Sequence, residues 1–82
     1  MRVLGIDPGL RLTGYGCVDL RENRPDPQLI EAGVLRLKAH RPLVHRLQQL
    51  HDDLQTVIAD LKPDLLAVEA LFSMYRNRRT TI

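Results

Sequence analysis

Two acidic residues stand where apolar segments of the chain end. Asp7 closes the first apolar segment, and Glu69 interrupts a later one over residues 65–70. If these segments are neighbouring parallel strands, their tips lie about 4.8 Å apart and the carboxylates converge. Two such carboxylates repel each other unless a proton or a cation lies between them. Mg²⁺ is typically held by one or two carboxylates, water and substrate phosphate. The pair therefore favours metal-dependent hydrolysis of a phosphodiester.

Each acid also has a structural explanation. Asp is favoured at the first position of a turn such as Asp7-Pro8-Gly9, because its carboxylate accepts hydrogen bonds from nearby backbone amides. Glu69 would serve equally well as a solvated strand end. Only the pairing of the two residues favours function, and the pairing depends on the order of the strands.

The elements that must position these acids follow from periodicity and turn signals. Three strands are predicted first, over residues 1–7, 12–20 and 29–37. The segment 22–28 contains two prolines and is predicted to be a surface loop. From Pro42 apolar residues recur at spacings of three and four, which predicts an amphipathic helix that Pro63 ends. Residues 65–70 predict a fourth strand, apolar enough to be covered on both faces.

These elements have few arrangements. Short connections make the first three strands antiparallel neighbours, and a right-handed strand–helix–strand crossover makes the fourth strand parallel to the first. The predicted fold is α/β, with a mixed sheet in the order 3-2-1-4 and one crossover helix. In that order, the tips of the first and fourth strands meet at one edge of the sheet.

Composition limits the remaining possibilities. The 82 residues suffice for one small domain, and a single cysteine, Cys17, excludes an intrachain disulfide. No apolar run is long enough to cross a bilayer and no signal segment begins the chain, so a cytoplasmic protein without membrane contact is expected. Arg76 and Arg78 lie in an acid-free C-terminal stretch and are candidate DNA phosphate contacts.

Other residues are given structural interpretations. His40, His45 and His51 are separated by five and six residues, whereas helical metal pairs require three or four. Gly14 and Gly16 could permit a close approach of DNA, but glycines within a strand more often mark a bulge or tight packing.

Two separated motifs resemble those of the RuvC family of Holliday-junction endonucleases. The matching segments are VLGIDPG at 3–9 with TGYG at 13–16, AGVLR at 32–36, and AVEA at 67–70 preceded by Pro63 and Asp64 and followed by Phe72. The resemblance covers essentially the whole chain. It implies a ribonuclease-H-like fold whose C-terminal part is missing here.

The resemblance also implies an activity and partners. RuvC enzymes are homodimers that use Mg²⁺ or Mn²⁺ to nick four-way DNA junctions, in recombination and repair, alongside the RuvA–RuvB branch-migration complex. Asp7 and Glu69 match the first two of the family's four acids. Phe72 matches an aromatic position that contacts junction DNA, where a ring could stack on unpaired bases.

The chain departs from the family by ending before the later acids. Residues 1–82 are therefore expected to be the N-terminal portion of a single nuclease domain, nearly inactive alone. One alternative is a non-catalytic relic that binds junctions, and related YqgF-type nucleases are a closer one. Another is an ATP-binding module of the actin, Hsp70 and sugar-kinase type. The segment 5–9 with Thr13 fits that module loosely, whereas Pro8 and Glu69 argue against it.

Overall fold

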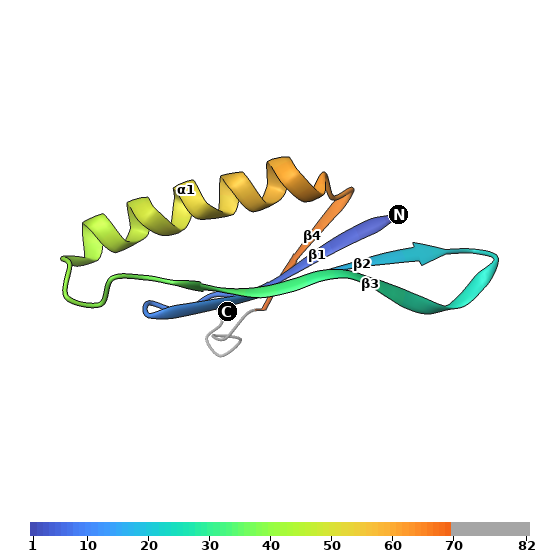
Figure 1. The fold of residues 1–82 in the computed structure, drawn as a ribbon, viewed down its shortest axis with the longest axis horizontal. Coiled ribbons are helices and arrows are strands. Elements are labelled where there is room, and N and C mark those ends of the chain that lie inside the picture. Colours follow the sequence, from blue (N-terminus) through green and yellow to red (C-terminus); the bar gives the residue numbers. More distant parts are fainter. Residues whose placement is uncertain (70–82) are drawn as a thin grey trace, which may run out of the picture.

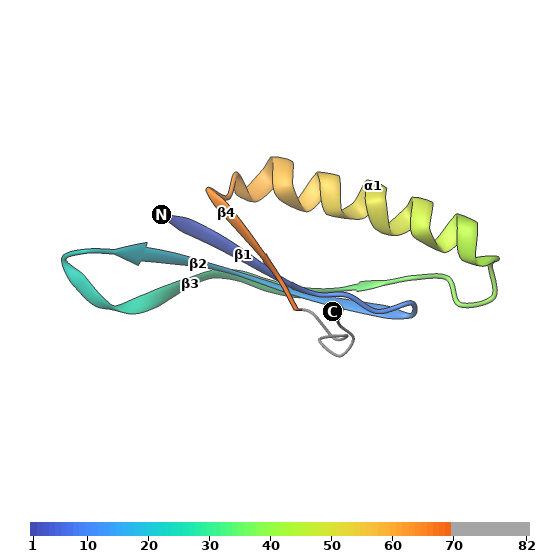
Figure 2. The ribbon, with the colours of Figure 1, turned by 180° about the vertical axis from the view of Figure 1, so that it is seen from behind.

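The computed structural model describes residues 1–69 and shows a single sheet with one helix lying along one of its faces (Figure 1; Figure 2 shows the opposite side). The elements, in chain order, are β1 (Arg2–Asp7), β2 (Leu12–Arg21), β3 (Arg24–Arg36), α1 (Leu43–Leu61) and β4 (Leu65–Val68). Four of the five lie close to their predicted positions, and β3 begins earlier than predicted.

The strand order is β3-β2-β1-β4, as predicted. β1 pairs antiparallel with β2 and parallel with β4, while β2 pairs antiparallel with β3. The parallel pair is joined through α1, which crosses over one face of the sheet (Figure 1). β1 is thus hydrogen-bonded on both of its edges.

The predicted loop over residues 22–28 is wrong. Only Glu22 and Asn23 form the turn, and β3 already begins at Arg24 and includes both Pro25 and Pro27. β3 is the edge strand of the described sheet, and proline is tolerated there when its missing N–H faces outward. Two prolines that are two residues apart occupy the same side of a strand, so both can face away from β2.

The core lies between α1 and the sheet. Leu4, Ile6 and Cys17 from β1 and β2 pack against Val57 and Leu61 in the C-terminal half of α1. Among residues 1–69 no helix is both long and apolar enough to span a membrane.

Part of the apolar surface has no cover within the described residues. Leu43 and Leu47 at the start of α1 are each 48% exposed, and all four β4 residues are exposed. The cover predicted for both faces of the fourth strand is therefore not supplied by residues 1–69.

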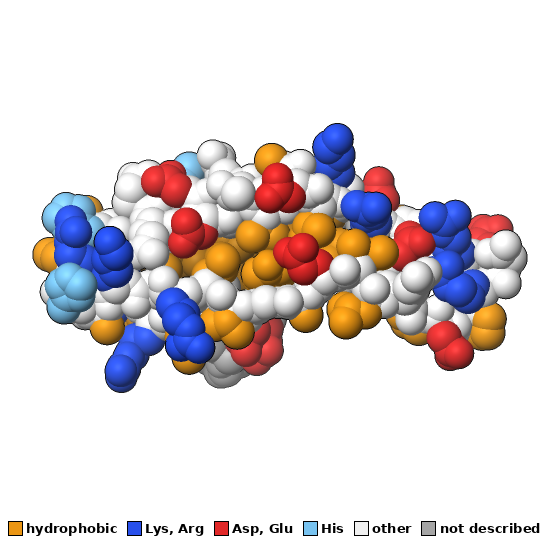
Figure 3. All heavy atoms as spheres, in the orientation of Figure 1, with side chains coloured by type: hydrophobic (Ala, Val, Ile, Leu, Met, Phe, Trp, Pro, Cys, Tyr) orange, Lys and Arg blue, Asp and Glu red, His pale blue; other side chains and the backbone are white. Residues whose placement is uncertain are grey.

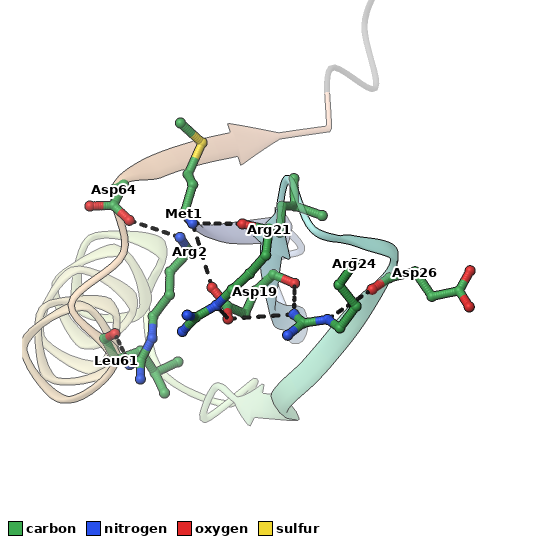
Figure 4. Close-up of polar contacts among 9 residues, drawn as sticks. Met1, Arg2, Asp19, Arg21, Arg24, Asp26, Leu61 and Asp64 are labelled. Atoms are coloured by element: carbon green, nitrogen blue, oxygen red, sulfur yellow. Dashed lines mark hydrogen bonds and ion pairs between the residues drawn. The ribbon is translucent and has the colours of Figure 1, made fainter.

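Polar contacts fix the entry into β4 (Figure 4). The Arg2 guanidinium donates to the Leu61 carbonyl at the end of α1, at 2.7 Å, and the Arg2 backbone N–H donates to the Asp64 carboxylate, at 2.8 Å. The Asp64 N–H in turn donates to the Arg2 carbonyl, at 2.8 Å. These contacts set the register that carries Glu69 to the tip of β1.

Asp19 lies at this same end of the sheet, where it is paired with Arg2 across β1 and β2 (Figure 4). Its side chain lies within ion-pair distance of the Arg21 and Arg24 guanidinium groups and of the Met1 amine. The hydrogen bond from Arg21, followed by the charges of Arg21 and of the terminal amine, lowers the pKa of the Asp19 carboxyl below its usual value. This cluster is structural and far along the strands from Asp7.

Candidate active site at the tips of β1 and β4

Asp7 and Glu69 occupy adjacent strand tips. The parallel ladder pairs Ile6 with Val68, and the Glu69 N–H donates to the Ile6 carbonyl at 2.9 Å. The next residues along the two strands are Asp7 and Glu69, so their backbones lie about 4.8 Å apart. The adjacency that the predicted strand order requires is present.

Both acids also face the same side of the sheet. Leu4 and Ile6 point into the core beneath α1, and side chains alternate along a strand, so Asp7 points to the opposite, open face. Val68 is paired with Ile6, which places Glu69 on the open face as well. Both acids are exposed, so both are accessible to a ligand that approaches this face.

The open face beside the acids is hollow. A depression of about 480 Å³ is lined by both carboxylate residues together with small residues from three strands. The small residues whose positions face this side are Gly5, Gly14, Gly16 and Ala67. We call this depression the glycine trough. It leaves the backbone of β1 and β2 open on this face, with the two acids at its end.

The fold itself does not require glycine at two of these positions. No glycine among the described residues has a positive φ, and a Cβ added at Gly16 would meet nothing within 4 Å. A Cβ at Gly14 would lie 4.0 Å from the Asp7 Cβ, which is ordinary contact. The register irregularities of β2 fall after Cys17, not here. The interpretation of Gly14 and Gly16 as a bulge or tight packing is therefore wrong.

The turn after β1 is tightly built. The Thr13 hydroxyl is buried and lies 3.1 Å from both the Gly9 N–H, which donates to it, and the Gly9 carbonyl, to which it donates. A Cβ at Gly9 would come within 2.2 Å of the Leu12 carbonyl oxygen, so only glycine fits. Within residues 1–69, the Asp7 carboxylate accepts no hydrogen bond from this turn, which leaves its oxygens available.

The set of donors at the site is small. No group of three or more His, Cys, Asp or Glu side chains comes together anywhere in residues 1–69. The site therefore offers two carboxylates. The other predicted contacts, Phe72, Arg76 and Arg78, lie outside the described residues. The glycine trough was not predicted as a site, because it depends on the cross-strand register of Gly5 with Gly16 and of Asp7 with Gly14, which the structure shows.

Sequence comparisons match nearly the whole chain to one family. The family model of crossover junction endodeoxyribonuclease RuvC matches residues 3–82. The RuvC protein of Paramagnetospirillum magneticum is 50% identical over 88% of this chain and 42% of its own length. That of Halorhodospira halophila is 43% identical over 99% of this chain and 46% of its own length. The chain thus spans less than half of these relatives.

Solved structures agree with the sequence relatives. Thermus thermophilus RuvC superimposes with a TM-score of 0.75 at 29% identity, over 94% of this chain and 46% of that chain. The same protein in complex with a Holliday junction substrate gives 0.73 at 30% identity, over 85% and 42%. The Aquifex aeolicus PPX-GPPA enzyme, at 13% identity and a TM-score of 0.61, shares the fold alone. By its sequence and its fold, this chain belongs to the RuvC family of crossover junction endodeoxyribonucleases.

Proposed function

We propose that the protein carrying this chain is a metal-dependent endonuclease that cuts four-way DNA junctions in recombination and repair. One observation carries the proposal: Asp7 and Glu69 lie on adjacent parallel strand tips and face the same open side of the sheet. The related Thermus thermophilus protein has been solved with a Holliday junction substrate, which supports DNA of this shape as the ligand.

The two carboxylates fit a hard divalent ion, for which we propose Mg²⁺ or Mn²⁺. Both are exposed and both offer oxygen donors, which these ions prefer. When bound, such an ion supplies an activated water and neutralises charge that develops on the phosphate. Asp7 and Glu69 would hold the ion, while the glycine trough admits a sugar–phosphate backbone to their side of the sheet.

The wider assembly is part of the same proposal. Residues 1–82 would form the N-terminal portion of a single nuclease domain in a homodimer, with Phe72, Arg76 and Arg78 in contact with the junction. The protein would act in the cytoplasm, where its DNA substrate lies, alongside a RuvA–RuvB branch-migration complex. The match of the family model over residues 3–82 supports this placement.

Neutral variants of the two acids test the proposal. Asp7→Asn and Glu69→Gln, made in the protein at the full length of its gene, should each lower junction cleavage by about 100-fold or more, because each removes a charged metal ligand. Asp60→Asn, an exposed acid of α1 away from the site, is the matched control and should cleave normally. Cleavage of a labelled four-way junction is the measurement.

Binding separates the catalytic role from a structural one. Each variant should still bind the junction in Ca²⁺ or EDTA with near wild-type affinity and unfold at an unchanged temperature. Normal cleavage by either variant would refute the proposed site. If the wild type binds the junction but cleaves it with neither Mg²⁺ nor Mn²⁺, the protein is a binding relic instead.

A further inference from the structure

Positive charge gathers at one end of the molecule. Residues 32–51 contain no Asp or Glu, and Figure 3 shows Lys, Arg and His side chains grouped at the end where β3 gives way to α1. We use the name basic end for four exposed cations there, Arg11, Arg36, Lys38 and Arg41. Within residues 1–69, none of the four lies within ion-pair distance of an acid.

The basic end lies at the same end of the sheet as the carboxylate pair. Gly14 pairs with Asp7 on one side and with Val34 on the other, and Leu12 pairs with Arg36. The alternation of side chains therefore places Arg36 on the open face, together with Asp7. Arg36 lies two strands away from Asp7 and two residues further along, so their backbones are about 12 Å apart. A nucleic acid strand lying over the acids can reach Arg36 within a few nucleotides.

A second hollow adjoins this position. It has a volume of about 800 Å³ and is lined by Arg11 and Arg36 together with small and apolar residues of the β1–β2 turn and the segment after β3. No acidic residue lines it. Two guanidinium groups without a counter-charge, in an open depression, suit a phosphate group, since guanidinium binds phosphate oxygens with paired hydrogen bonds.

The backbone that carries these cations is held in place. The Arg46 guanidinium donates to the carbonyls of Arg41, at 3.0 Å, and Leu10, at 3.1 Å, which ties the start of α1 to the β1–β2 turn. The Gln49 amide donates to the Arg36 carbonyl, at 3.1 Å, and accepts from the Lys38 N–H, at 3.3 Å. The cationic segment is thus ordered before any ligand binds, which lowers the entropic cost of binding.

The placement of this charge opposes the stability of the helix. α1 has no acid in its first turn and no basic residue in its last, whereas Arg41 precedes it and Arg46 lies in its first turn. Cations at a helix N-terminus face the positive end of the macrodipole and are unfavourable there. Residues that break a local rule in this way occur where function requires them. A bound anion would relieve the repulsion.

We propose that the basic end binds the sugar–phosphate backbone of DNA that extends beyond the carboxylate pair. The inference rests on the proposed function for the identity of the anion, and extends it by assigning phosphate contacts to Arg11 and Arg36, which line the acid-free hollow, with Lys38 and Arg41 beside them. These residues set affinity and orientation and do not touch the reacting phosphate.

A pair of double variants tests this assignment. Arg11→Gln/Arg36→Gln removes the two charges that line the hollow of the basic end, and Arg21→Gln/Lys62→Gln removes two from elsewhere. Both are made at full gene length in an Asp7→Asn background, so that binding is measured without cleavage. The first should reduce the slope of log affinity against log salt by about 2 and weaken junction and duplex binding alike by about tenfold. The second should leave the slope unchanged.

The outcomes separate this inference from the proposed function. Equal slopes for the two double variants would overturn the basic end as a phosphate site, even if the protein binds DNA. Absence of DNA binding by the Asp7→Asn parent at low salt would overturn the proposed function and the inference with it. Thermal unfolding of each variant confirms that the fold is intact.

Discussion

Gly16 occupies a strand position that would accept a side chain, yet carries none. Glycine within a strand weakens it, because it loses more conformational freedom on folding than other residues and packs nothing. At Gly16 neither a positive φ nor a neighbouring atom explains that cost. The empty space above Gly16 is part of the glycine trough beside Asp7 and Glu69. We therefore attribute the glycine to the space that the proposed sugar–phosphate backbone needs in the trough.

Gly16→Ala should separate stability from activity. The unfolded chain loses freedom while the folded strand gains no clash, so the free energy of unfolding should rise by about 0.4–1 kcal/mol. Junction cleavage should fall, because the new methyl group stands on the floor of the trough. Denaturant melts and single-turnover cleavage are the measurements.

Gly33→Ala is the contrasting variant for that experiment. A Cβ at Gly33 would come within 2.7 Å of the Tyr15 hydroxyl oxygen, which donates to Glu31 at 2.7 Å, so the ring must shift and stability should fall. If Gly16→Ala cleaves junctions as fast as the wild type, the trough does not receive the substrate.

The two acids could be predicted from the sequence, whereas the trough could not. Asp7 and Glu69 each interrupt or end an apolar segment, and one topological rule brought the two segments together. The trough depends on which residue of β2 lies opposite which residue of β1. That register, Gly5 with Gly16 and Asp7 with Gly14, is fixed by the length of the turn at Gly9 and only becomes visible in the structure.

At the scale of elements, α1 ends in an unusual conformation. Lys62 is the one non-glycine residue with positive φ in the described chain, at φ 50 and ψ 57, and its N–H donates to the Ile58 carbonyl at 2.9 Å. This left-handed residue turns the chain from α1 into Pro63 and β4. Glycine is the usual choice at such a position because it has no Cβ.

Lys62→Gly should therefore stabilise the protein by about 1 kcal/mol, since a left-handed conformation costs a side-chain-bearing residue about that much. Its DNA cleavage should not change, because the substitution leaves the register of β4 intact. Lys62→Ala keeps the Cβ and controls for loss of the charge. If the unfolding temperature of Lys62→Gly were no higher than that of Lys62→Ala, this explanation of the helix end would be contradicted.

Element boundaries were predictable where a single strong signal set them. The stripe of leucines after Pro42 and the stop at Pro63 predicted α1 to within a residue at each end. The start of β3 was missed because Pro25 and Pro27 indicate a loop unless the strand is known to lie at an edge. Whether a strand lies at an edge depends on the assembled sheet, so it cannot be predicted from the residues of that strand alone.

At the scale of the whole molecule, the described residues form a two-layer structure with α1 on one face of the sheet (Figures 1 and 2). The alternation of side chains places the two acids on the other face. Apolar residues on the open face and at the β4 edge are exposed, including Leu12 at 51% and Leu65 at 53%. Residues 70–82 contain no Asp, Glu or His. The 82 residues thus bring two carboxylates to the trough and no third ligand of those types from the C-terminal stretch.

Residues 1–82 expressed alone should consequently show no junction cleavage above the background of metal alone, whereas the protein at its full gene length should cleave. The reason is that the chain spans less than half the length of the RuvC relatives it matches, and within residues 1–69 no third acid or histidine comes close to the two carboxylates. Single-turnover assays at matched concentration are the measurement. Cleavage by the 82 residues at a comparable rate would show that two acids suffice.

The two-sided pairing of β1 has a consequence for how the site can be observed. Its amides are enclosed between β2 and β4, and Leu4 beneath it is completely buried, so they open to solvent only in the rarest fluctuations. Hydrogen exchange should therefore be slowest at the amides of β1. The exchange rate of these amides then shows directly whether the strand that carries Asp7 is intact. Slow deuterium uptake by residues 2–7 would show that the site is folded in a given variant, whether or not that variant cuts DNA.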